Sequence, residues 1–205
     1  GGYLKRKQAA AGNRRTYTIS AWVKRAAIQN GSILVCGASN NAVFRLRFSG
    51  GFLNAYDYDD SYAHGFRWKF TTNAQFRDMS AWYHIVLAVD TTQSTNTNRF
   101  KVYVNGTQHT SFSSFDYPAQ NYESYLNDDE DMWLGETVSL DSAGNLYLAE
   151  VNFIDGQQLT ASDFGETGTY GEWKPIEYEG TYGTNGYYLP FKQDYTVEGF
   201  STVTY

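Results

Sequence analysis

The segment from Phe52 to Trp68 holds the side chains best suited to bind a ligand. Sugar rings present apolar C–H faces, so a glycan site typically combines flat aromatic side chains with a few converging polar groups. If one strand runs from Phe52 to Tyr58, its even-numbered side chains share one face, opposite Leu53 and Ala55. The candidates for glycan binding are Asn54, Tyr56 and Tyr58 on this face, and Tyr62 and Trp68 in the loop expected after the strand. The alternative is that these aromatic side chains pack against neighbouring strands or another subunit.

Catalytic motifs are absent from the sequence. The three histidines, His64, His84 and His109, lie on separate segments, with no spacing that would set two metal ligands on one face. His84 is better explained as a hydrogen-bonded strand residue. No serine lies in a Gly-x-Ser-x-Gly elbow, and the acidic run from Asp128 to Asp131 lies in a polar segment that is typical of a solvated surface. We therefore predict no catalytic residue.

Length and composition favour one large all-β domain. The chain has 205 residues, 18% of them aromatic, with 19 Gly and only 3 Pro, a mixture that suits strands joined by turns. The net charge of −6 argues against a groove that follows nucleic-acid phosphates. No apolar run is long enough to span a bilayer, so membrane insertion is not expected. The single Cys36 lies among apolar residues, which predicts a buried, inert thiol.

The elements that would position these side chains are strands, because apolar and polar residues alternate with a period of two. Residues 43–48 and 52–58 flank Gly50 and Gly51 and predict a hairpin. Residues 82–90 are apolar on both faces, which is typical of a central strand. Residues 100–107 alternate and contain Asn105-Gly106, the pair that favours a type I′ hairpin turn.

Further strands are predicted over residues 17–24, 146–154 and 187–191, the last with Pro190 at an edge or a strand end. The polar segments 91–98, 111–131 and 165–186 are predicted to be loops. The side chains expected in the interior are Trp22, Ile85, Leu87, Val102, Val104, Val151 and Phe153.

Three segments in this order carry a resemblance to a known family: residues 18–24 (TISAWVK), residues 82–86 (WYHIV) followed by Asp90, and residues 102–106 (VYVNG). Together they resemble the laminin G-like, concanavalin A-like jelly roll over roughly Tyr3 to Phe191. The fold class implied is an all-β, two-sheet antiparallel sandwich.

A narrower resemblance rests on residues 148–159 (LAEVNFIDGQQL), 164–166 (FGE), 173–175 (WKP) and 182–189 (YGTNGYYL). These segments resemble a subgroup found in structural proteins of tailed, especially marine, bacteriophages. This implies a virion-surface or tail-fibre module, located on an extracellular particle, that contacts host glycans or other virion proteins and that can form a homo-oligomer. In that subgroup further β-rich domains often follow, so residues 192–205 are expected to be a linker or the first strand of a next domain.

The resemblance also implies two chemistries that the residues support only in part. Relatives often bind calcium at the rim of the sandwich, and Asp57, Asp59 and Asp60 are the weak candidates; the alternative is a solvated acidic turn. Relatives of the glycosidase type carry paired carboxylates about 5 Å apart on one strand, but the expected Glu-x-Asp-x-x-Glu is absent. We therefore expect a noncatalytic recognition module without a required cofactor. A divergent glycoside hydrolase and a free-standing lectin remain the alternatives.

Overall fold

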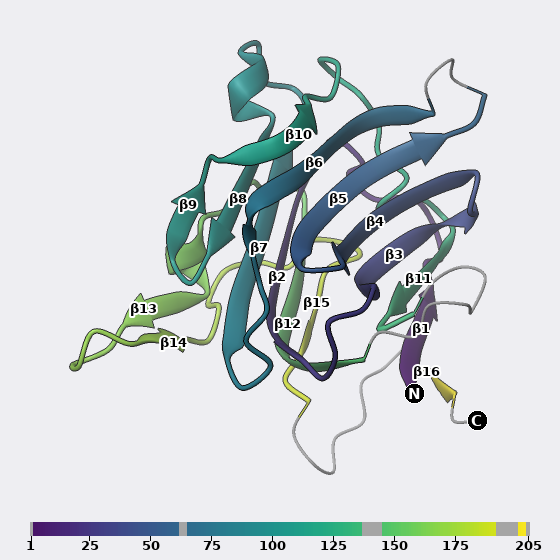
Figure 1. Ribbon diagram of the computed structural model, residues 1–205. Coiled ribbons are helices and arrows are strands. Elements are labelled where there is room, and N and C mark those ends of the chain that lie inside the picture. The colour runs from purple at the N-terminus through teal and green to yellow at the C-terminus, as the bar shows by residue number, and fades with distance from the viewer. Residues whose placement is uncertain (1, 62–64, 137–144, 192–200, 204–205) are drawn as a thin grey trace.

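Two antiparallel β-sheets packed face to face form the body of the protein (Figure 1). The computed structural model describes residues 2–61, 65–136, 145–191 and 201–203. Within these ranges the chain forms strands and two short 3-10 helices, with no α-helix. The predicted all-β, two-sheet antiparallel sandwich is therefore confirmed.

The larger sheet contains eight strands that run from one edge to the other in an order different from that of the sequence. In spatial order they are β10 (Phe112–Asp116), β6 (Phe66–Gln75), β5 (Phe52–Asp59), β4 (Ala42–Ser49), β3 (Gly31–Ser39), β11 (Asp131–Leu134), β1 (Tyr3–Lys7) and β16 (Ser201–Val203). The predicted hairpin of residues 43–48 and 52–58 is confirmed as β4 and β5. The strand β16 adds to the edge formed by β1, and the domain boundary at residue 191 stays a prediction.

The smaller sheet contains six strands. They are β15 (Tyr187–Leu189), β12 (Leu146–Asp155), β2 (Thr16–Arg25), β7 (Trp82–Asp90), β8 (Phe100–Val104) and β9 (Thr107–His109). The strand β7 lies between β2 and β8, as its apolar faces predict. The predicted edge position before Pro190 is confirmed, because β15 pairs only with β12.

The hairpin between β8 and β9 depends on two residues with positive φ. Asn105 has φ of 47° and Gly106 has φ of 81°, which matches the predicted type I′ turn. A Cβ atom on Gly106 would lie 2.6 Å from the indole of Trp173, so glycine is also needed here for close packing.

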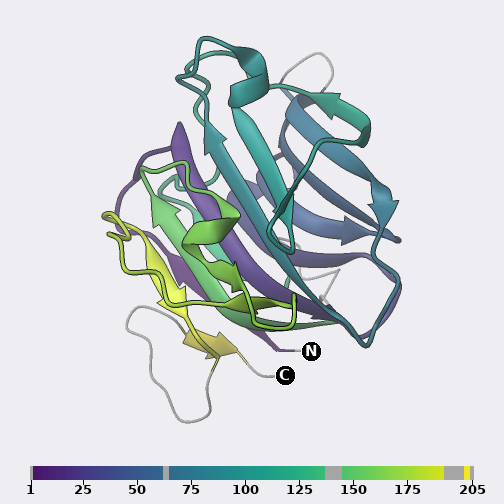
Figure 2. The ribbon, with the colours of Figure 1, turned by 90° about the vertical axis from the view of Figure 1, so that its left-hand side faces the viewer.

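The three predicted loops are only partly irregular. Residues 91–98 include the 3-10 helix η1 (Asn96–Asn98), residues 111–131 contain β10, and residues 165–186 contain the hairpin of β13 (Gly165–Thr167) and β14 (Trp173–Pro175). The loop prediction was therefore wrong for β10, β13 and β14, whose short runs do not show a clear period of two. The segment from Gln157 to Tyr182, which also includes η2 (Ala161–Asp163), lies over the outer face of the six-stranded sheet (Figure 2).

The core lies between the two sheets and confirms most of the expected interior. Five of the predicted side chains are fully buried: Ile85, Leu87, Val102, Val151 and Phe153. Val104 is half-buried and packs against this core. The prediction for Trp22 was wrong, because Trp22 lies on the outer face of β2, where its ring stacks on His84 with 5.1 Å between centroids. Cys36 is buried as predicted, and burial raises the pKa of its thiol to about 12.

Candidate functional site

Aromatic side chains gather on the outer face of the eight-stranded sheet, away from the core. Alternation along each strand sends one set of side chains inward and the next set outward. The outward set forms an apolar cluster, and Tyr58 packs against its edge; the members are Tyr3, Val35, Val43, Tyr56 and Trp133. These side chains come from five neighbouring strands, and none of them is more than 9% exposed.

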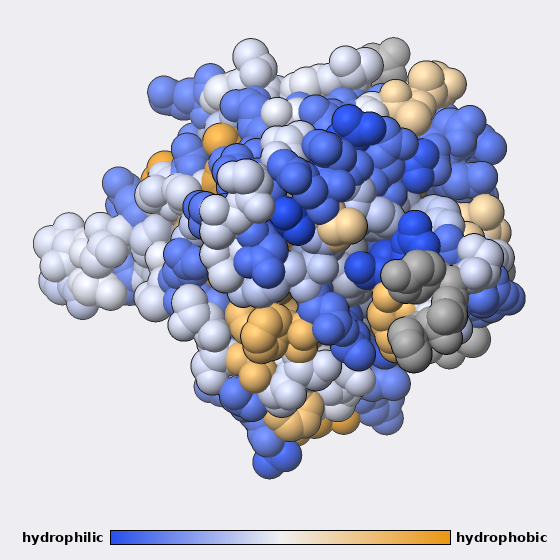
Figure 3. Space-filling model, turned by 90° about the horizontal axis from the view of Figure 1, so that it is seen from above, coloured by the Kyte–Doolittle hydropathy of each residue, from blue (hydrophilic) through white to orange (hydrophobic). Residues whose placement is uncertain are grey.

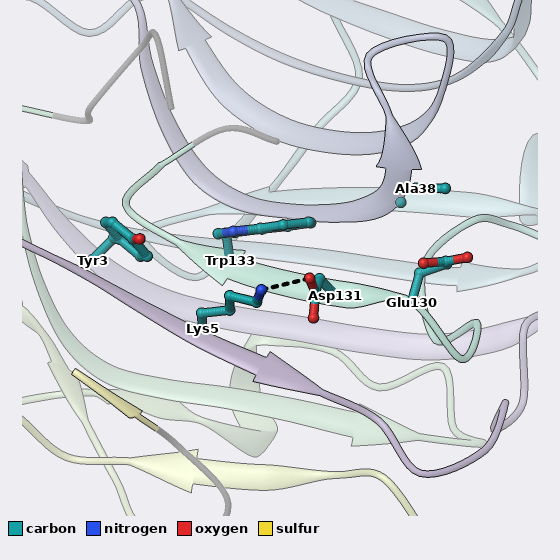
Figure 4. A pocket seen from close by; sticks show the side chains of 7 residues that line it. Tyr3, Lys5, Ala38, Glu130, Asp131 and Trp133 are labelled. Carbon is teal, nitrogen blue, oxygen red and sulfur yellow. Dashed lines mark ion pairs between the residues drawn. The ribbon is translucent and has the colours of Figure 1, made fainter. Parts of the chain in front are cut away.

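An open pocket of about 320 Å³ lies at one end of this cluster, over β1, β3 and β11. Its lining residues are Tyr3, Lys5, Gly37, Ala38, Glu130, Asp131 and Trp133. Figure 4 shows the rings of Tyr3 and Trp133 side by side, with the Lys5 ammonium reaching across to Asp131. The Lys5 Nζ lies 2.6 Å from Asp131 Oδ2 and 5.7 Å from the centroid of the Trp133 ring.

Charged and polar side chains also lie beside the rings of the neighbouring strands on this face. The Arg47 guanidinium lies 5.3 Å above the ring of Tyr56, and its Nε donates a hydrogen bond to Asn54 Oδ1 at 3.3 Å. Phe66 contacts both Tyr56 and Tyr58 edge to face, with centroids 5.3 and 5.2 Å apart. Flat rings beside guanidinium, ammonium and amide groups can contact both the C–H faces and the hydroxyls of a sugar.

The structure brings three of the five predicted glycan residues together on this outer face. Asn54, Tyr56 and Tyr58 lie on β5 and point outward, as the alternation predicts, although Tyr56 is only 9% exposed because its neighbours cover the ring. Tyr62 lies outside the described residues. The prediction for Trp68 was wrong, since Trp68 lies on β6 and points into the core with no exposed surface.

The alternation of buried residues along β6 explains this error. Trp68, Phe70 and Thr72 are all fully buried and share the inward face. The sequence analysis placed Trp68 in a loop, but β6 already begins at Phe66, so Trp68 is a strand residue whose side chain faces the core.

The three aspartates considered for calcium do not share one solvated turn. Asp57 is fully buried and accepts hydrogen bonds from Trp68 Nε1, Ser124 Oγ and the Tyr125 amide. Burial raises the pKa of Asp57 to about 6, although these donors favour its charged form. Asp59 instead accepts hydrogen bonds from the amide and hydroxyl of Ser61, and Asp60 is exposed.

Metal-ligating side chains are therefore dispersed in the described part of the chain. No group of three or more His, Cys, Asp or Glu residues that could hold a metal ion occurs among the described residues. Asp57 was expected to be either a calcium ligand at the rim or part of a solvated turn. Both expectations were wrong, because Asp57 is buried in the core.

The pocket residues were missed by sequence reasoning because they meet only through long-range pairing. Leu4 pairs with Leu134, and Lys5 pairs with Trp133. The local signal was present, since Tyr3 and Lys5 alternate with the core-facing Leu4, and Asp131 and Trp133 alternate with the core-facing Met132. Such short runs predict strands, but they do not reveal that the two strands are neighbours.

One pair of side chains has the geometry of a nucleophile and a base. Ser20 Oγ lies 2.9 Å from Nε2 of His84, and Trp173 Nε1 lies 2.9 Å from His84 Nδ1. Because an indole nitrogen can only donate, Nδ1 must accept, so the ring proton is on Nε2 and is donated to Ser20. Burial also lowers the pKa of His84 to about 4. His84 cannot take a proton from Ser20 in this state, and its predicted role as a hydrogen-bonded strand residue is confirmed.

Comparison with solved structures places the fold among known sandwiches. The native heptameric SAP-like pentraxin from Limulus polyphemus is 16% identical, with a TM-score of 0.53 over 78% of this chain and 71% of that chain. Domains LG4-5 of the mouse laminin alpha1 chain are 13% identical, with a TM-score of 0.54 over 93% of this chain and 44% of that chain. The binding domain of botulinum neurotoxin serotype G is 14% identical, with a TM-score of 0.50 over 78% and 38%.

At these identities the likeness shows the fold alone, and the chain matches less than half the length of the laminin and neurotoxin structures. In the described ranges, no helix is long and apolar enough to cross a bilayer. No curated protein sequence matches this chain. The Laminin_G_3 family, described as the concanavalin A-like lectin/glucanases superfamily, matches residues 1–163. With that match over most of its length, the chain belongs to the laminin G-like branch of the concanavalin A-like lectin/glucanases superfamily.

Proposed function

We propose that this chain is a noncatalytic recognition module that binds a glycan through the outer face of its eight-stranded sheet. The observation that carries the proposal is the pocket where the rings of Tyr3 and Trp133 lie beside Lys5, Glu130 and Asp131. The two rings are largely covered in the free chain, with Tyr3 8% and Trp133 6% exposed, so the depression offers a small apolar contact for sugar C–H groups beside charged groups for hydroxyls.

The two sheet faces are unequal, and this supports binding on the larger sheet. The outer face of the six-stranded sheet is covered over Val86, Tyr103 and Ile154 by the segment from Gln157 to Tyr182. The outer face of the eight-stranded sheet carries the pocket and the aromatic cluster instead. The lectin members of the superfamily and the likeness to a neurotoxin binding domain are consistent with this function.

The noncatalytic part of the proposal rests on the carboxylates of the pocket. A glycoside hydrolase needs two carboxylates that face each other across the scissile bond. Glu130 and Asp131 are adjacent in sequence, and Asp131 is ion-paired with Lys5. Two carboxylates that are neighbours in sequence, one of them already engaged by the Lys5 ammonium, do not form the facing pair that a hydrolase uses.

We further propose that the module belongs to a phage particle, where it contacts a host-surface glycan or another virion protein. Support comes from the sequence resemblance of residues 148–189, the segment that builds β12, η2, β13, β14 and β15. Several tethered copies on a particle would raise avidity by about 10² to 10⁴ without new contacts, which suits a site with few exposed rings.

The test is a glycan array that includes bacterial surface polysaccharides, followed by adsorption of the protein to host cells. The variants Lys5→Ala, Glu130→Gln and Tyr58→Ala change exposed or half-buried groups of the site, and Tyr170→Ala, at a position that is 94% exposed in the β13–β14 hairpin, is the matched control. We expect each site variant to weaken binding by about 2- to 10-fold and Tyr170→Ala to bind as the wild type does. Equal binding by all four folded variants would contradict a glycan site on this face and would leave contact with virion proteins as the remaining role.

A further inference from the structure

Exposed apolar side chains gather at one end of the six-stranded sheet. Four of the seven large apolar side chains that are exposed in the described ranges lie there: Ile28, Met79, Trp82 and Tyr147. At this end β2 finishes, β7 and β12 begin, and the Ala26 amide donates to the Asn145 carbonyl at 2.7 Å. Figure 1 shows the turn after β2 and the loop before β7 together at the lower end of the molecule.

Three of the side chains at this end form a row across the outer face of the sheet. Tyr147 pairs with Lys24, and Lys24 pairs with Trp82. Directly opposite residues in antiparallel strands share a face, and Val23 next to Lys24 points into the core, so the row points outward. Neighbouring strands are about 4.8 Å apart, which places the Tyr147 and Trp82 positions roughly 10 Å apart, close to the span of a disaccharide.

Both rings of this row are accessible and lie beyond the part of the face that the C-terminal segment covers. Trp82 is 40% exposed and Tyr147 is 59% exposed. The next row along the face is a stack of rings, since Trp22 stacks on His84 at 5.1 Å and His84 stacks on Trp173 at 6.0 Å. Packed rings behind the row limit how far its backbone can move, so the exposed rings are held in place.

The charge of Lys24 determines which ligand fits the row. None of the ion pairs found in the described part of the chain involves Lys24. The pKa of the nearby Asp78 is lowered mainly by hydrogen bonds from the hydroxyl and the amide of Ser80, and the charge of Lys24 makes a smaller contribution. A cation without an ion pair, placed between two exposed rings, complements a sugar that carries a carboxylate.

We propose that Tyr147, Lys24 and Trp82 form a second glycan site, specific for oligosaccharides that contain a carboxylated sugar such as a hexuronic acid. The two rings stack on successive sugar units, and the Lys24 ammonium pairs with the carboxylate between them. The site lies on the other sheet from the pocket of Tyr3 and Trp133, so it is independent of the proposed function and can fail separately.

The test is calorimetric titration of the whole chain with oligogalacturonate and with the same oligosaccharide after chemical reduction of its carboxyl groups. We expect millimolar to submillimolar binding of the acidic form and weaker binding of the reduced form. The variants Trp82→Ala and Tyr147→Ala should each weaken binding about 2- to 10-fold, and Lys24→Gln should remove the preference for the acidic form.

Matched controls separate this site from other parts of the surface. Lys101→Gln alters a lysine on β8 of the same sheet, and Tyr170→Ala alters the exposed hairpin tyrosine; both should bind as the wild type does. The proposal is overturned if no form of the oligosaccharide binds, if the reduced form binds equally well, or if Lys5→Ala and Tyr58→Ala abolish binding while Trp82→Ala does not. In the last case the ligand would occupy the other sheet.

Discussion

The indole Nε1 of Trp68 donates a hydrogen bond of 2.6 Å to Asp57 Oδ2 inside the core, from the neighbouring strand of the same sheet. Ser124 Oγ donates to the same oxygen at 2.6 Å, and Tyr17 donates in turn to Ser124 at 3.1 Å. A buried carboxylate is costly unless donors surround it; here the donors come from β6 and from the segment before β11, and β2 is linked to them through the bond from Tyr17 to Ser124. Asp57 therefore ties three segments together within the core.

The pH dependence of stability should reveal this carboxylate. Burial raises the pKa of Asp57 from 3.8 to about 6. The protonated carboxyl therefore stabilises the folded state below the pKa of Asp57 in the unfolded chain, and this contribution is lost as the pH rises through about 6. Relative to Asp57→Asn, the wild-type free energy of unfolding should fall by about 2 kcal/mol between about pH 4 and about pH 7. Urea denaturation over this range measures the difference. Asp60→Asn, at an exposed position, is the control, and a wild-type-to-Asp57→Asn difference that did not change with pH would refute the assignment.

His84 should show the opposite dependence. Burial lowers the pKa of His84 from 6.5 to about 4. Its contribution to stability is therefore present above the pKa of His84 in the unfolded chain and is lost as the pH falls through about 4. Relative to His84→Gln, the wild type should lose about 3 kcal/mol as the pH falls from about 7 to about 4. In the wild type the two slopes oppose each other over much of this range.

The ring proton of His84 is a second observable. Because Trp173 donates to Nδ1, the imidazole should be the neutral Nε2–H tautomer at neutral pH. Nitrogen-15 chemical shifts of the ring distinguish the two tautomers directly. A proton on Nδ1 would mean that Trp173 does not donate to this nitrogen. The free Nε2 could then act as a base toward the Ser20 hydroxyl.

Leu87 tests the placement of the core. Its side chain is fully buried on the central strand β7, so Leu87→Ala should lower the free energy of unfolding by about 2 to 5 kcal/mol. Ile28→Ala, at a position that is 44% exposed, should cost less than about 0.5 kcal/mol. Equal losses in the two variants, measured by denaturant unfolding, would show that β7 does not face the core.

Much of the fold could be predicted from the sequence because the alternation of apolar and polar residues determines which face of each strand is buried. The period of two in residues 100–107, together with Asn105-Gly106, predicts both the hairpin and its turn. The alternation along residues 17–24 places Trp22 on the outer face, where the structure has it, and the prediction for the interior was wrong because it relied on the bulk of the side chain and on the family resemblance.

The candidate site was only half predictable for a related reason. Asn54, Tyr56 and Tyr58 lie on one strand, so alternation alone places them on one face. The pocket arises where β1 meets β11, and that pairing joins Lys5 to Trp133 across most of the domain. Trp68 was misplaced because it was assigned to a loop, whereas β6 begins two residues before it, at Phe66.

Incubation with polysaccharides tests the noncatalytic assignment. We expect no release of reducing sugar from β-glucan or from bacterial polysaccharide, because the carboxylate pair of a hydrolase is not formed by Glu130 and the ion-paired Asp131. Glu130→Gln serves as the decisive comparison. Sugar release by the wild type that disappears in Glu130→Gln would show that the pocket is an active site of the glucanase type.

Mapping a bound glycan onto the protein tests the central claim most directly. The glycan selected on the array is titrated into nitrogen-15-labelled protein, and the amide and indole signals are followed by NMR. The account predicts that the largest shifts fall on Tyr3, Lys5 and Trp133, with smaller ones on Tyr58. Shifts confined to residues outside the outer face of the eight-stranded sheet, with these four signals unchanged, would contradict it.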